Sequence, residues 1–170
     1  MRVSSKWGAP EKAAKRLRID AWNRDGQIHF PVDPFAIADK LGIKTSRGIL
    51  DADTAGFIVK RHGADQVRAV VNASDAPVRQ RFTLAHELGH YVQHKDDAEL
   101  GFVEERAVLS STGTSWPEIW ANKFAAELLM PRATVVKWWA SDRTVEDMAR
   151  RFDVSKAAML HRIKNLGLNA

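Results

Sequence analysis

The chain has 170 residues, a formal net charge of +5 and no cysteine. This length suffices for one domain with a hydrophobic core, or for a compact domain with a small appendage. The lack of cysteine excludes disulfide bonds and thiolate metal sites. No apolar stretch is long enough to span a bilayer and no signal-peptide hydrophobic region is evident, so we expect a cytoplasmic protein with no membrane partner.

The first part of the chain predicts two helices followed by three short strands. Apolar residues recur at helical spacing over 10–24, and Asp33-Pro34 begins a short helix over 35–41 that Gly42 ends. The strand-like segments that follow, separated by Asp/Gly-rich turns, are 43–50, 56–61 and 66–72. This order predicts a small α+β domain with a short antiparallel or mixed sheet.

A helix over 79–94 carries the sequence His-Glu-Leu-Gly-His at 86–90. His86 and His90 are four residues apart, so their imidazoles project from one helical face and can share a metal ion. Glu87 lies about 100° around that face and can reach a water on the metal without itself being a ligand. The motif predicts a zinc site in which Glu87 is a base.

The apolar residues of this helix fall on the side opposite His86, Glu87, His90 and His94. An alternative interpretation is an amphipathic helix whose His/Glu face is solvated, because this short motif also occurs by chance. Gly89 destabilises a helix by roughly 1 kcal/mol relative to alanine. We expect its missing side chain to let a strand or a substrate approach the metal.

A catalytic zinc needs a third protein ligand, and the sequence offers two candidates. His94 lies a further turn along the same helix, about 12 Å from His86, which is too far for direct coordination. Glu118 begins a proline-bounded helix over 116–131 and has Asn122 four residues later as a supporting amide. Ser115 and Glu118 also form a capping-box pattern that needs no metal, so the residues alone leave ligand and cap open. Glu127 falls on the far side of this helix.

After an acidic and Ser/Thr-rich surface connection over 96–113, the chain ends in a predicted helical pair over 144–168. A tight turn at Asp153 is followed by Ser155 as the N-cap of the second helix. The cationic residues of that second helix are Lys156, His161, Arg162 and Lys164. A helix-turn-helix unit of this kind can read DNA, and both ends of the chain are basic. The favoured interpretation is that the helical pair packs against the rest of the protein or docks a substrate.

Three segments resemble the ImmA/IrrE family of bacterial metallo-endopeptidases. The first is Arg-Phe-Thr-Leu-Ala-His-Glu-Leu-Gly-His at 81–90. The second is Glu118 with Ala-Asn-Lys-Phe-Ala-Ala-Glu-Leu-Leu-Met-Pro at 121–131. The third is Met-Ala-Arg-Arg-Phe-Asp-Val-Ser at 148–155, followed by Arg-Ile-Lys-Asn-Leu-Gly at 162–167. Together they cover most of residues 66–168, which is far more specific than the histidine motif alone.

The resemblance implies a zincin-like fold of the gluzincin type, with residues 1–131 as the protease core and 132–170 as a helix-turn-helix-like segment packed on it. Carried over to this chain, the zinc ligands are His86, His90 and Glu118, and Glu87 is the catalytic base. Members of the family typically cleave a helix-turn-helix repressor and so release genes of mobile elements or stress responses. The alternative is a DNA-binding regulator in which zinc is only structural; nucleic acid is therefore a partner that we do not favour.

The sequence also suggests how a protein substrate would bind. An extended peptide could pair with the strand at 66–72, which precedes the zinc helix. The group that stabilises the oxyanion is left open among four residues: Tyr91, His94, His62 and His161. Tyr91 lies toward the apolar side of its helix, where a core role is favoured.

Overall fold

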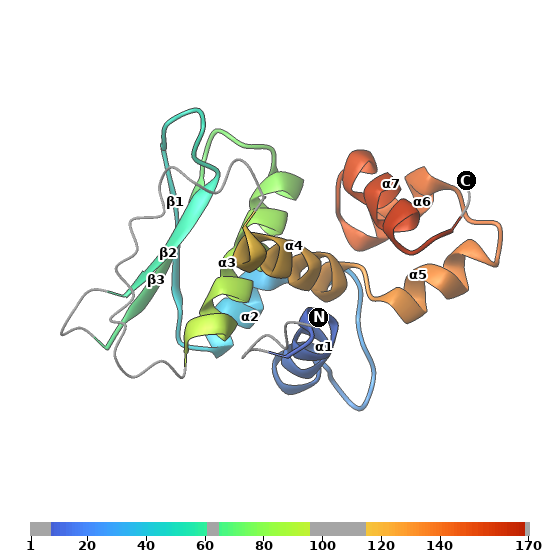
Figure 1. Ribbon diagram of the computed structural model, residues 1–170, viewed down its shortest axis with the longest axis horizontal. Helices are drawn as coiled ribbons and strands as arrows, with labels where there is room; N and C mark the ends of the chain where they lie inside the picture. Colours follow the sequence, from blue (N-terminus) through green and yellow to red (C-terminus); the bar gives the residue numbers. More distant parts are fainter. Residues whose placement is uncertain (1–7, 61–64, 96–114, 169–170) are drawn as a thin grey trace.

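The computed structural model describes residues 8–60, 65–95 and 115–168. Within these residues the chain forms seven helices and a three-stranded sheet, which confirms the α+β class. In Figure 1 the sheet lies at the left, helix α3 (Pro77–His94) runs along it, and the C-terminal helices form a group at the right. The predicted surface connection over 96–113 lies outside the described residues. No helix in the described part of the chain combines the length and apolarity needed to cross a bilayer.

The sheet is mixed, with strand order β1-β3-β2. The central strand β3 (Val67–Asn72) pairs parallel with β1 (Lys44–Gly48) and antiparallel with β2 (Gly56–Lys60). Both edges of β3 are therefore occupied, so the expectation that a substrate pairs with the strand at 66–72 is wrong. Residues Ala69 and Val71 are buried beneath the helices, as the alternation along this strand predicted.

The two N-terminal helices are α1 (Pro10–Ala21) and α2 (Pro34–Lys40). Helix α1 ends earlier than predicted because a turn follows it, in which Asp25 and Gly26 both have positive φ. Helix α2 begins as expected: Asp33 is its N-cap and accepts a hydrogen bond from the backbone of Phe35 at 2.9 Å.

Helix α4 (Trp116–Leu129) packs closely on α3 at Gly89. A Cβ atom at this position would lie 3.1 Å from Phe124 Cδ1 and 3.2 Å from Ala121 Cα. The group that approaches Gly89 is thus a second helix, and not the strand or substrate that the sequence suggested. The glycine lets α4 come close enough to α3 for their side chains to form one site.

Three more helices complete the described chain: α5 (Arg132–Trp139), α6 (Val145–Phe152) and α7 (Lys156–Asn165). The sequence analysis did not predict α5. The turn between α6 and α7 was predicted correctly: Asp153 has a φ of 54°, and Ser155 Oγ accepts a hydrogen bond from Ala158 N at 3.0 Å.

Two arginines connect the α6–α7 pair to the helices at the centre of the molecule. Arg81 of α3 donates to the carbonyl oxygens of Val32, at 2.7 Å, and Asp153, at 3.1 Å. Arg162 of α7 is buried, donates to the Met130 carbonyl at 3.0 Å and pairs with the carboxylate of Glu127. The predicted helical pair therefore contacts both α3 and the end of α4.

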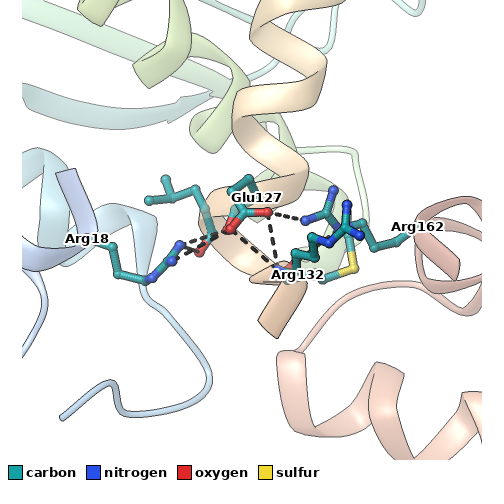
Figure 2. A network of polar contacts seen from close by, with 6 residues as sticks. Arg18, Glu127, Arg132 and Arg162 are labelled. Atoms are coloured by element: carbon teal, nitrogen blue, oxygen red, sulfur yellow. Dashed lines mark hydrogen bonds and ion pairs between the residues drawn. The ribbon is translucent and has the colours of Figure 1, made fainter. Parts of the chain in front are cut away.

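Glu127 is the centre of a buried polar network (Figure 2). Its carboxylate lies between the guanidinium groups of Arg18 and Arg162 and accepts the backbone N–H of Arg132 at 3.2 Å, at the start of α5. Arg18 also donates to the Glu127 carbonyl at 2.8 Å. Two cations thus share one carboxylate, and the negative end of the α4 dipole contributes to balancing the second charge.

Candidate metal centre

Helix α3 places His86 and His90 one turn apart with their Nε2 atoms 3.0 Å from each other. Both imidazoles and Glu87 are buried, with between 6% and 9% of their surface exposed. The alternative of a solvated His/Glu face is therefore wrong. Helix α4 covers that face, so α3 is enclosed on both sides over its middle turns.

Glu118 of α4 faces the two histidines. Its Oε2 lies 3.1 Å from His86 Nε2, and its Oε1 lies 3.1 Å from His90 Nε2. Ser115 is the N-cap residue of α4, but its side chain makes no capping hydrogen bond, so the Ser115 half of the predicted capping box is not formed. The ligand atoms of His86, His90 and Glu118 all lie within 4.8 Å of one another, an arrangement that can hold a metal ion.

Two side-chain amides orient the imidazoles. Asn122 Oδ1 lies 2.9 Å from His86 Nδ1, which matches its predicted supporting role. Gln93 Oε1 lies 2.9 Å from His90 Nδ1, a contact that the sequence analysis missed. When each Nδ1–H donates to an amide oxygen, each Nε2 faces the other histidine and Glu118, where it can hold a proton or bind a metal ion.

The electrostatics of this cluster favour a cation. Burial by itself would raise the pKa of the Glu118 carboxyl. The hydrogen bonds with His86 and His90 outweigh burial and lower that pKa well below its usual range. Burial likewise acts to lower the pKa of His86, and it is outweighed by Glu118 and Glu87, which raise that pKa. Two imidazole Nε2 atoms and a carboxylate converge on one point, and this donor set of two nitrogens and one oxygen fits the three protein ligands of a catalytic zinc once a metal replaces the protons on nitrogen.

Three of the four candidates for oxyanion stabilisation lie in the described residues, and none of these three belongs to the group of His86, His90 and Glu118. Tyr91 is half-buried and packs against the hydrophobic core, as the apolar side of its helix predicted. His94 is half-buried at the end of α3, and His161 is exposed on α7. His62 lies outside the described residues. Glu127 is at the other end of α4 from Glu118, in agreement with the prediction that it does not reach the site.

The cationic residues of α7 are less available than the sequence suggested. Arg162 is buried against Glu127, which agrees with the favoured interpretation that this helix packs on the rest of the protein and not with the DNA-reading alternative. Lys156 is exposed but pairs with Glu146 of α6. His161 and Lys164 are the remaining exposed members of the predicted set.

Comparison with known proteins agrees with this site. Residues 38–164 match the sequence profile of a family of M78 peptidases, which is described as the IrrE N-terminal-like domain. The radiation response metalloprotease IrrE of Deinococcus radiodurans is 31% identical over 96 residues, which cover 54% of this chain and 29% of that protein. Immunity region protein 2 of Bacillus phage phi105 is 28% identical over 117 residues, covering 69% of this chain and 70% of that protein.

A second IrrE, from Deinococcus deserti, is 32% identical over 96 residues, and the chain spans only about a third of either IrrE. Among solved structures, a Mycobacterium tuberculosis transcriptional regulator superposes with a TM-score of 0.58 at 18% identity, covering 91% of this chain and 46% of that one. This likeness concerns the fold alone. The family model covers well over half of the chain and includes all three clustered residues, so the chain belongs to the ImmA/IrrE family of metallopeptidases.

Proposed function

We propose that the protein is a zinc-dependent endopeptidase of gluzincin type, with His86, His90 and Glu118 as zinc ligands and Glu87 as the catalytic base. The observation that carries this proposal is the convergence of the three ligand atoms within 4.8 Å, on two helices far apart in sequence. Three protein ligands leave a coordination position for water, as in catalytic zinc sites and unlike closed structural ones.

The chain's own residues supply proton transfer and orientation. When bound, zinc supplies Lewis acidity that makes water a nucleophile near neutral pH. Glu87 directly follows His86 on α3, is 6% exposed, and raises the pKa of His86 by its charge. Glu87 accepts the proton from the attacking water and returns it to the leaving amine. Asn122 holds the ring of His86 in place during this exchange.

Strand β2 is the proposed docking edge for an extended peptide, in place of β3. It is an edge strand of the described sheet and packs directly on α3. A Cβ atom at Gly56 would lie 2.7 Å from Thr83 Cγ2, and Thr83 precedes His86 by one helical turn. A peptide that pairs with the outer edge of β2 by backbone hydrogen bonds would therefore run beside the metal helix.

The proposed substrate is a helix-turn-helix repressor, whose cleavage would derepress mobile-element or stress genes. Two relatives support this choice: one is a radiation response metalloprotease and the other an immunity region protein of a phage. Both names describe conditional programmes of gene expression. A repressor encoded beside this protein's gene is the first substrate to test.

The test compares wild-type protein with Glu87→Gln, which keeps the size of the side chain and removes the base. Zinc-loaded wild-type protein should cleave the repressor, as followed by mass spectrometry of the products. Glu87→Gln should bind one zinc per chain and cleave nothing. Cleavage by Glu87→Gln at the wild-type rate contradicts the assigned base, and zinc binding without hydrolysis of any repressor supports a structural metal instead.

A further inference from the structure

Gln93 contacts both helices of the metal centre with one side chain. It lies near the end of α3, three residues after His90, and is 3% exposed. Its Oε1 is 2.9 Å from His90 Nδ1, and its Nε2 donates to the carbonyl oxygen of Pro117 at 3.2 Å. Pro117 immediately precedes Glu118 in α4.

The chemistry of these partners fixes the direction of the amide. A carbonyl oxygen can only accept a hydrogen bond, so the Gln93 group that faces Pro117 must be the NH₂. The group that faces His90 is then the amide oxygen, which also can only accept. His90 must therefore donate from Nδ1, and in its neutral form its Nε2 carries the lone pair. The Pro117 carbonyl thus favours the Nδ1–H tautomer of His90 through the orientation of the Gln93 amide.

We propose that Gln93 is a positioning residue that holds His90 in the metal-binding tautomer and ties that ring to the start of the helix carrying Glu118. The inference rests on the ligand role proposed for His90, and it does not depend on the identity of any substrate. The two amides of the site have different tasks. Asn122 is exposed and holds His86 from α4, whereas Gln93 is buried and spans from α3 to α4.

Without the Gln93 amide, the single ring proton of neutral His90 has a better acceptor at Nε2 than at Nδ1. Glu118 Oε1 lies 3.1 Å from His90 Nε2, so an Nε2–H tautomer would donate to that carboxylate. In the Nε2–H tautomer one proton lies between His90 Nε2 and Glu118 Oε1, and a metal ion must displace that proton before it binds. Loss of Gln93 should therefore change the tautomer and weaken zinc binding together.

The experiment follows both quantities in Gln93→Leu. Nitrogen-15 NMR of the metal-free protein, recorded over a pH series, reports which ring nitrogen carries the proton of neutral His90. Wild-type His90 should be in the Nδ1–H form, and Gln93→Leu should shift it to the Nε2–H form. Zinc affinity, measured by competition with a chelator, should fall roughly 10- to 100-fold.

Two control variants separate positioning from general damage. Gln93→Glu keeps an acceptor for His90 Nδ1 but loses the donor to Pro117, so it should retain the Nδ1–H form and recover only part of the affinity that Gln93→Leu loses. Asn122→Ala should leave the His90 tautomer unchanged, because its contact is with His86. Wild-type tautomer and affinity in Gln93→Leu overturn the inference, as does loss of the Nδ1–H form in Gln93→Glu. If wild-type protein binds zinc but cleaves nothing, the proposed function fails while these readouts still decide the role of Gln93.

Discussion

Replacement of Gly89 by alanine tests whether the close approach of α4 to α3 builds the metal centre. The added methyl group would lie 3.1 Å from Phe124 Cδ1, 3.2 Å from Ala121 Cα and 3.3 Å from Ala121 Cβ. These separations are a few tenths of an ångström below ordinary contact, and two of the three involve the backbone or Cβ of α4. The helix must therefore move as a body, and Glu118, one turn earlier on α4, moves with it.

The magnitude combines two opposing effects on the free energy of unfolding. Alanine in place of glycine stabilises a helix interior by about 1 kcal/mol. Overpacking of a filled core costs about 1–3 kcal/mol. The metal-free protein should thus lose between roughly 0 and 2 kcal/mol. Zinc binding should weaken more clearly, because metal–ligand distances tolerate shifts of only about 0.2 Å.

The assay measures denaturant unfolding of metal-free protein and zinc affinity by chelator competition, for Gly89→Ala, Ala121→Gly and the double variant. Ala121→Gly removes one of the facing atoms, so the double variant should recover zinc affinity relative to Gly89→Ala, a coupling between neighbours in contact. A Gly89→Ala protein that is about 1 kcal/mol more stable and binds zinc like wild type would refute the packing argument, since only the helix-propensity gain would then remain.

Three further predictions concern the ligands and the buried ion pair. Glu118→Gln should lower zinc affinity more than the roughly 10- to 100-fold typical of a supporting residue, and unchanged affinity in the chelator assay would remove Glu118 from the ligand set. Zinc affinity should fall as pH drops from about 8 to 6, because the raised pKa of His86 makes a proton an effective competitor. The stability of the metal-free protein changes with pH in the opposite direction. The stabilisation that comes from the raised pKa of His86 is complete below about pH 6.5 and is lost as the pH rises through the pKa of His86 in the folded protein. The rise in Tm caused by zinc should therefore grow with pH. Arg162→Met should cost about 1–3 kcal/mol in denaturant unfolding, because it removes the hydrogen bonds of Arg162 to Glu127 and to the Met130 carbonyl while Arg18 still pairs with Glu127. The exposed control Lys164→Met should stay within about 0.5 kcal/mol, and equal stability of the two variants would contradict the buried pair.

The two histidines of the site could be predicted from the sequence, because they lie on one helix. The contribution of the second helix could be predicted only in part. His86 and His90 are brought together by helical spacing alone, so a five-residue motif suffices. Glu118 lies on another helix, and its spacing from Ser115 satisfied a capping box equally well. The packing of α4 on Gly89 is a long-range event, and it decides which way that carboxylate faces.

The errors have the same physical origin. The basic pattern around Arg162 left a DNA-reading alternative open, because its partner Glu127 is 35 residues away and the local sequence does not show the pair. The strand at 66–72 was taken as an accessible edge, yet strand order is set by pairing between distant segments. Gln93 gave one usable signal, its position three residues after His90 on the same helix, although polar residues at this spacing are common at helix ends.

The network around Glu127 bears on the order of events when the chain is made. Helix α4 carries Glu118 in its first turn and Glu127 near its last, about 13 Å apart along the helix axis. One partner of Glu127, Arg18, leaves the ribosome early, and the other, Arg162, leaves among the last residues described. Synthesis proceeds from the N-terminus, so a nascent chain that ends before α7 contains all three proposed ligands but lacks one of the two cations that fix the far end of α4. The far end of the helix that carries Glu118 is therefore fixed only after α7 has been synthesised.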